Sequence, residues 1–279
     1  MNTTRRSGLN STALALIPLA IAINIAVGQI VQTLKWPLYI DSIGTVLVGA
    51  LLGPWLGLLT GVLANVIWTL TGLPNSGPAI NFAYVAGAIG LIAGFAGRAG
   101  LFQRQSPRWL SALVGGIFVF ALTIFVLMFV NRSPDPDAFP PFPSAGDLLQ
   151  QYPIVFLITT LIGLAAGYFI LQRAGYAGIV GLLTGVVAAV LSAPMAAVVF
   201  GGVTGAGTDL LVAAFRASGG SILESTFAQG VTSDPFDKMT SFLIVWLIVQ
   251  SLPRRLLARF PNTQAVQEST PVSQPATSR

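Results

Sequence analysis

The sequence contains no cysteine and no histidine. Without cysteine the chain can form no disulfide and use no thiolate chemistry. Without histidine it lacks the commonest general base and a usual ligand of zinc and haem. A glycine-rich phosphate loop of the Walker type is also missing. We therefore expect no catalytic residues, no metal site, no cofactor and no enzymatic activity in this chain, and any ATP hydrolysis would be carried out by partner subunits.

Charged residues are also scarce, at 8% of the chain, whereas hydrophobic residues make up 54%. A soluble domain has about 25% charged residues, so this composition does not suit a soluble surface. The net charge of +5 does not indicate a nucleic-acid partner, because the basic residues form no stripe with interleaved aromatic residues. The composition predicts an integral membrane protein in contact with the lipid bilayer.

Eight apolar stretches divide the sequence. They are residues 13–34, 38–53, 54–72, 79–97, 109–131, 153–172, 176–200 and 236–252. A run of about 20 apolar residues crosses the hydrocarbon core as a helix. The predicted fold is therefore all-α, a polytopic transmembrane bundle of about eight helices. The first stretch follows two arginines but continues to Leu34, which is too long for a signal peptide and favours an uncleaved helix.

The basic residues are distributed unevenly across these stretches. If residue 1 is cytoplasmic and each stretch crosses once, ten of the fourteen Lys and Arg residues fall in cytoplasmic segments. Lys and Arg resist translocation, so this bias predicts that both termini are cytoplasmic. We divide the chain into a cytoplasmic N-terminus (1–10), a transmembrane domain (11–260) and a disordered cytoplasmic tail (261–279). The predicted location is the plasma membrane of a prokaryote.

Two segments are harder to assign. Residues 131–152 contain five prolines, so we expect an outer loop without a helix. Residues 201–235 are apolar but rich in glycine, and they form either a loop or one or two short helices that dip into the outer leaflet. A re-entrant segment would require a cavity, because irregular backbone at membrane depth must be satisfied by protein or water.

Small residues recur at four-residue spacing in several stretches. Such spacing lets two helix backbones approach closely, and most of these pairs are expected to pack inside the bundle. The pairs are Gly57 and Gly61, Gly90 and Gly94, Gly163 and Gly167, and Gly181 and Gly185. The first stretch has a similar face formed by Ala15, Ala22 and Ala26, which either packs internally or receives a partner helix.

Polar side chains lie mainly in the outer half of the predicted membrane. A polar group in hydrocarbon is costly unless it is paired, so this one-sided distribution predicts a cavity open to the exterior rather than a continuous channel. The candidate substrate-binding residues are Asp41, Asn65, Trp68, Asn81, Tyr84, Asp237 and Lys238. A local role is the alternative for the acids, since Asp41 and Asp237 would each suit the N-cap of a helix.

Several short motifs add a family resemblance. They are Pro37–Gly44 (PLYIDSIG), Gly49–Gly57 (GALLGPWLG), Gly61–Asn65 (GVLAN), Gly201–Gly205 (GGVTG), Asp234–Lys238 (DPFDK) and Leu252–Arg255 (LPRR). Together with the Ala22-x-x-x-Ala26 face, they resemble the substrate-binding S component of energy-coupling factor (ECF) vitamin transporters. Members of that family usually have six helices, so residues 109–172 would be an inserted helix pair.

The resemblance implies a function. It implies a subunit that captures a vitamin or related micronutrient from outside and docks on a transmembrane scaffold subunit with two ATPase subunits. The loop after the first helix, with Trp36 and Tyr39, would be a gate, and the face formed by Ala15, Ala22 and Ala26 would dock on the scaffold. The module would topple in the membrane to release its cargo inside.

Two other functions are compatible with a bundle of this kind. One is the membrane sensor module of a signalling system, although no cytoplasmic output domain follows in this sequence. The other is a stand-alone secondary transporter, which would predict inverted repeats and midplane ion ligands on broken helices. Trp36, Trp68 and Tyr84 would suit stacking against a flat heteroaromatic substrate such as a flavin, thiamine or a pterin.

Overall fold

The computed structural model describes residues 11–131, 133, 143–217 and 219–262, and within them the chain is an all-α bundle without strands. The elements are α1 (Ser11–Thr33), α2 (Ile43–Leu52), α3 (Pro54–Leu70), the 3-10 helix η1 (Gly77–Phe82), α4 (Ala83–Arg98), α5 (Arg108–Val130), α6 (Ala145–Gln151), α7 (Pro153–Phe169), α8 (Gly175–Phe200), α9 (Asp209–Ala217), α10 (Ile222–Ser251) and α11 (Arg254–Leu257). The predicted all-α fold is confirmed. The predicted N-terminus (1–10), the centre of the proline-rich loop and most of the tail lie outside the described residues.

The helices identify a membrane protein. Four helical stretches are long and apolar enough to cross a bilayer, namely Leu14–Thr33, Gly77–Arg98, Arg108–Met128 and Gly175–Phe200, and the bent pair α6–α7 would make a fifth. The other predicted stretches also contain helices, but they differ from simple spans. The ten residues of α2 extend only about 15 Å, and α10 carries charged residues in its middle.

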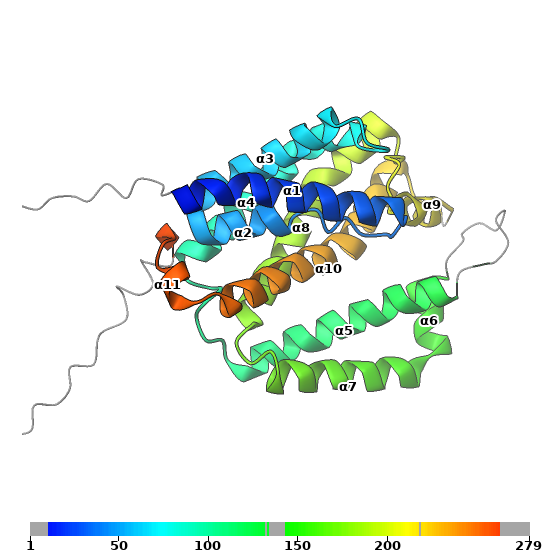
Figure 1. Ribbon diagram of the computed structural model, residues 1–279. Coiled ribbons are helices and arrows are strands. Elements are labelled where there is room, and N and C mark those ends of the chain that lie inside the picture. The colour runs from blue at the N-terminus through cyan, green and yellow to red at the C-terminus, as the bar shows by residue number, and fades with distance from the viewer. Residues whose placement is uncertain (1–10, 132, 134–142, 218, 263–279) are drawn as a thin grey trace, which may run out of the picture.

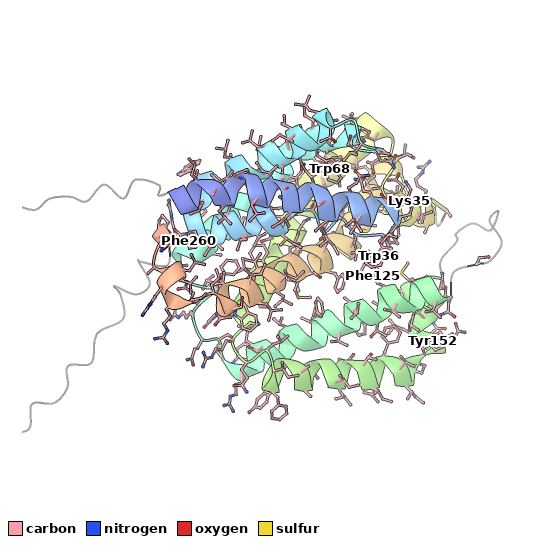
Figure 2. All side chains as sticks on the ribbon, in the orientation of Figure 1. Lys35, Trp36, Trp68, Phe125, Tyr152 and Phe260 are labelled. Atoms are coloured by element: carbon pink, nitrogen blue, oxygen red, sulfur yellow. The ribbon has the colours of Figure 1, made fainter. Side chains whose placement is uncertain are left out.

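Successive long helices run in alternate directions, so the bundle has two distinct ends (Figure 1). The start of α1 and α11 lie at one end, called the inner end here after the predicted orientation. The end of α1 and α9 lie at the other, called the outer end. Figure 2 places Lys35 and Trp36 at the outer end and Phe260 at the inner end. The pair α5–α7 forms a separate layer beside α10 and α8.

Glycines allow several helices to touch through their backbones. A Cβ atom at Gly90 would overlap the backbone of Gly57, which joins α4 to α3. One at Gly167 would overlap the Ser111 carbonyl and so joins α7 to α5, and one at Gly185 would overlap the backbone of α10. The four-residue glycine spacing therefore serves internal packing, as the sequence predicts.

Helix α1 has one buried face and one exposed face. On the buried face, Asn24 accepts a hydrogen bond from the backbone nitrogen of Gly44 (2.6 Å) and donates one to Thr45 (2.8 Å), which joins α1 to α2. On the other face, Ala15, Ala22 and Ala26 are exposed. Within the described chain, this small-residue face is not used for internal packing.

Two helices differ from the predicted stretches. Helix α6 lies in the proline-rich stretch 131–152, where no helix was expected, and a capping box between Ser144 and Asp147 starts it. Helix α10 begins at Ile222, well before residue 236 and within the segment for which a loop or short helices were expected, with a capping box between Ser221 and Glu224. The segment 201–235 is thus a loop (201–208), the short helix α9 and the first half of α10.

The packed bundle includes residues beyond position 260, where the transmembrane domain was expected to end. The buried Asn262 side chain lies against α2 and α4 and donates hydrogen bonds to the carbonyls of Gly49 and Ala50, both at 3.2 Å. It therefore satisfies backbone acceptors near the end of α2, close to the sharp Gly53 turn that has φ +107°. Residues 263–279 lie outside the described part of the chain.

Candidate binding cavity

A cavity with mainly apolar walls and several polar or charged side chains lies at the outer end of the bundle. Its volume is about 80 Å³, within a wider hollow of about 680 Å³ that includes open solvent. Its walls come from α1, the loop 34–42, α3, η1, α4, α8, the loop 201–208 and α10. Segments distant in sequence thus converge on one hollow, as expected of a binding site rather than of a local packing defect.

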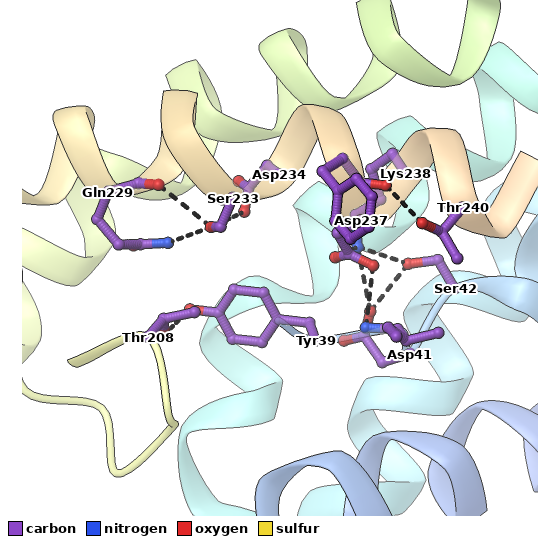
Figure 3. A network of polar contacts seen from close by, with 12 residues as sticks. Tyr39, Asp41, Ser42, Thr208, Gln229, Ser233, Asp234, Asp237, Lys238 and Thr240 are labelled. Carbon is purple, nitrogen blue, oxygen red and sulfur yellow. Dashed lines mark hydrogen bonds and ion pairs between the residues drawn. The ribbon is translucent and has the colours of Figure 1, made fainter. Parts of the chain in front are cut away.

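Helix α10 supplies the charged floor of the cavity. Lys238 donates hydrogen bonds to Asp237 (2.7 Å), to Ser42 (2.9 Å) and to Asp41 (3.3 Å), as Figure 3 shows. A lysine ammonium has three N–H groups, so all three are engaged. Lys238 therefore holds the floor together and has no N–H group free for a ligand.

Asp237 holds the loop segment that leads into this floor. Its side chain is fully buried, and its second oxygen accepts a hydrogen bond from the backbone nitrogen of Ile40 at 3.0 Å. Ile40 has a φ of +46°, a conformation that β-branched residues rarely adopt without support. The Asp237 carboxylate thus supports a strained turn that directs Asp41 toward Lys238.

Asp234 lies one helical turn before Lys238, on the same face of α10, and lines the cavity. It is only 3% exposed, and its hydrogen bond within the described chain comes from the neighbouring Ser233 at 3.3 Å. Unlike Asp41 and Asp237, it makes no ion pair with a described residue. Gly185 of α8 lets the backbones approach here, because any side chain would overlap Asp234 and Pro235.

The side walls combine an indole ring with amide groups. Trp68 is 3% exposed, and its ring nitrogen donates to Gln29 at 3.0 Å. Gly28 of α1 gives the ring its space, since a Cβ there would come within 2.7 Å of it. Asn65 donates to the carbonyl of Ala79 at 3.0 Å, which leaves its amide oxygen for other partners. The buried side-chain oxygen of Gln32 has no hydrogen-bond partner.

Two loops meet over the cavity mouth. The Tyr39 hydroxyl lies 2.8 Å from the Thr208 hydroxyl (Figure 3), and Lys35 donates to the carbonyl of Gly205 at 2.6 Å. Asp209 shapes the second loop by accepting hydrogen bonds from the backbone nitrogens of Thr204 (3.0 Å) and Gly205 (2.6 Å). The loop 34–42 is therefore latched to the loop 201–208 above the cavity.

The structure brings most of the predicted binding residues together. Asp41, Asn65, Trp68 and Lys238 line the cavity, and Asp237 lies directly beneath it. Neither Asp41 nor Asp237 caps a helix. The residue at the N-cap of α2 is Ser42, which makes no side-chain cap bond, and Asp237 is in the middle of α10.

Asn81 and Tyr84 do not line the cavity. The face of η1 and α4 toward the cavity carries Phe82, Val85 and Ile89, so residues one position earlier point elsewhere. Asn81 donates weakly to Pro78 at 3.5 Å. Tyr84 is 44% exposed and donates to the carbonyl of Leu191 on α8 at 2.7 Å.

The two predicted gate residues separate. Tyr39 lines the cavity, whereas Trp36 lines a second, apolar groove together with Phe125 and Phe236. Figure 2 shows Trp36 near Phe125 of α5. Asp234 and Gln32, which line the cavity, were not among the predicted binding residues. The only signal for Asp234 and Gln32 in the sequence was that each is a polar residue in an apolar setting.

No group of three or more acidic side chains in the described residues is arranged to hold a metal ion. Comparisons with known protein families, with characterised proteins and with solved structures gave no match. The assignment of a function therefore rests on the residues and their geometry.

Proposed function

We propose that this protein is the substrate-capture subunit of an ECF-type importer in a prokaryotic plasma membrane. It binds a vitamin or related micronutrient in the outer-end cavity and delivers it by docking on a scaffold subunit that carries two ATPase subunits. The observation that carries the proposal is the cavity itself, where the PLYIDSIG, GVLAN, GGVTG and DPFDK motifs all contribute lining residues.

Three further features support the proposal. The cavity is at the end of the bundle opposite the arginine-rich helix termini, such as the end of α4 and the start of α11. Two loops that line the cavity, 34–42 and 201–208, are joined by hydrogen bonds of Lys35 and Tyr39, so that segments distant in sequence enclose one side of the site. The face with Ala22 and Ala26 is exposed, as a docking surface for another membrane helix would be.

The proposal is tested by purifying the full chain in mild detergent and identifying retained small molecules by mass spectrometry. Trp68 and Trp55 are both on α3, but Trp68 lines the cavity whereas Trp55 is 68% exposed. We expect a retained micronutrient in the wild type and in Trp55→Phe, and a reduced amount in Trp68→Phe. Equal retention in the two variants, or no retained molecule and no uptake with any scaffold module, would refute the proposal.

A further inference from the structure

We infer that the cavity takes a small organic cation, a flat heterocycle with one positive charge. This inference rests on the proposed function and narrows its substrate class. The buried charges of the cavity supply the first argument. The carboxylates of Asp41 and Asp234 line the cavity and that of Asp237 lies beneath it, against the single ammonium of Lys238.

This excess of carboxylates over ammonium groups lies in buried surroundings, where a charge is costly. Asp234 is 3% exposed and Asp237 fully buried, and an uncompensated charge in such surroundings is strongly unfavourable. Lys238 is shared by Asp41 and Asp237. Asp234 lines the cavity and makes no direct ion pair in the described chain, although the charge of Lys238 acts on it from one helical turn away. A positive group on a ligand would supply the missing partner.

Several of the hydrogen-bonding groups left open are acceptors. Lys238 has no N–H group left, because its three donors are already engaged. The second carboxylate oxygens of Asp41 and Asp234 receive no hydrogen bond from described residues, and the Gln32 oxygen is buried without a partner. Such acceptors suit a ligand that donates hydrogen bonds, and the carboxylates of Asp41 and Asp234 in the lining disfavour an anion.

The shape and the aromatic lining favour an organic cation over a bare metal ion. Trp68, Tyr39 and Phe82 line the cavity, and aromatic faces attract cations and stack on flat rings. A hard metal ion instead requires several oxygen ligands at about 2.0–2.6 Å. Among the described residues, the acids do not converge in that way.

The test uses matched probes on the purified full-length protein in detergent. The panel consists of flat heterocycles in three charge states, such as 1-methylnicotinamide (cation), nicotinamide (neutral) and nicotinate (anion). Thermal shift ranks the probes and titration gives Kd. We expect the cations to bind about tenfold or more tightly than their neutral parents, which is the effect of one charge-assisted hydrogen bond. Identifying any molecule that co-purifies shows independently whether it is a cation.

Asp234→Asn keeps the shape of the side chain and removes its charge, so the preference for cations should fall about tenfold. Asp147→Asn is the matched control, because Asp147 belongs to the α6 capping box and does not line the cavity. Tighter binding of neutral or anionic probes, a neutral or anionic co-purified molecule, or an unchanged preference in Asp234→Asn overturns the inference but leaves the proposed function standing. If no probe binds and nothing co-purifies, the inference fails, and the proposed function fails with it when uptake with a scaffold module is absent as well.

Discussion

The Lys238 ammonium on α10 lies 3.3 Å from the Asp41 carboxylate, although 197 residues separate them in sequence. This contact joins the loop 34–42 to the last long helix and closes the cavity floor. The same ammonium binds Asp237, which in turn supports the backbone of Ile40. One lysine therefore positions both the acidic floor and the loop that carries Tyr39.

Removing that lysine should destabilise the protein. Lys238→Met leaves two carboxylates without a counter-charge, and breaking a buried ion pair costs about 3–5 kcal/mol. Thermal or denaturant unfolding in detergent measures the loss. Lys35→Met is the matched control, because Lys35 makes one exposed hydrogen bond and should cost about 1 kcal/mol. Equal losses in the two variants would show that the Lys238 network does not stabilise the fold.

The contact between α8 and α10 should tolerate no side chain at Gly185. A Cβ atom there would overlap the backbone of Asp234 and Pro235, so Gly185→Ala should destabilise the protein by about 1–3 kcal/mol and weaken ligand binding by displacing Asp234. Gly77→Ala serves as the control, because nothing lies within 4 Å of a Cβ at Gly77. A fully stable Gly185→Ala variant with normal binding would contradict the packing described.

Docking on the scaffold subunit and binding of the ligand should be separable by mutation. Ala22→Trp places a bulky ring on the exposed face of α1, away from the cavity, so we expect normal ligand binding but loss of uptake in cells that contain the scaffold and ATPase subunits. Ala165→Trp makes the same change on an exposed position of α7 and should leave uptake intact. Uptake that persists in Ala22→Trp would exclude this face as the docking surface.

The orientation can be tested by cysteine labelling, because the natural chain has no cysteine. Leu73 is in the loop between α3 and η1 at the outer end, and Gln105 is in the loop between α4 and α5 at the inner end. A membrane-impermeant maleimide should label Leu73→Cys in intact cells and Gln105→Cys only after permeabilisation. The reverse pattern would place the cavity on the cytoplasmic side.

The long apolar elements could be predicted from sequence because a bilayer imposes a simple composition on them. Helix α5 occupies Arg108–Val130 and α8 occupies Gly175–Phe200, each within one or two residues of its predicted stretch at 109–131 and 176–200. The start of α10 was missed because the residues before Phe236 are polar. These polar side chains are accommodated at the cavity and by local contacts such as the hydrogen bond from Gln229 to Ser233. A hydropathy profile does not register such contacts.

The candidate site was predicted in part. Asp41, Asn65 and Trp68 were found because polar or large aromatic residues in an apolar segment need partners. Asn81 and Tyr84 lie outside the cavity lining, at the junction between η1 and α4, where the direction of the side chains depends on the tertiary packing. The pairing of Lys238 with Asp41 could not be read from sequence, because the two residues meet only when α10 packs beside the start of α2.

The central claim is that the outer-end cavity holds a small molecule between Trp68, Tyr39 and Asp234. An experimental density map of the protein, purified with the molecule that it retains or with its tightest-binding probe, tests this claim most directly. The account predicts a compact density among those three side chains, with the loop 34–42 latched to Thr208. Density confined to the apolar groove beside Trp36 and Phe125, or a cavity closed by side chains with the molecule bound elsewhere, would contradict it.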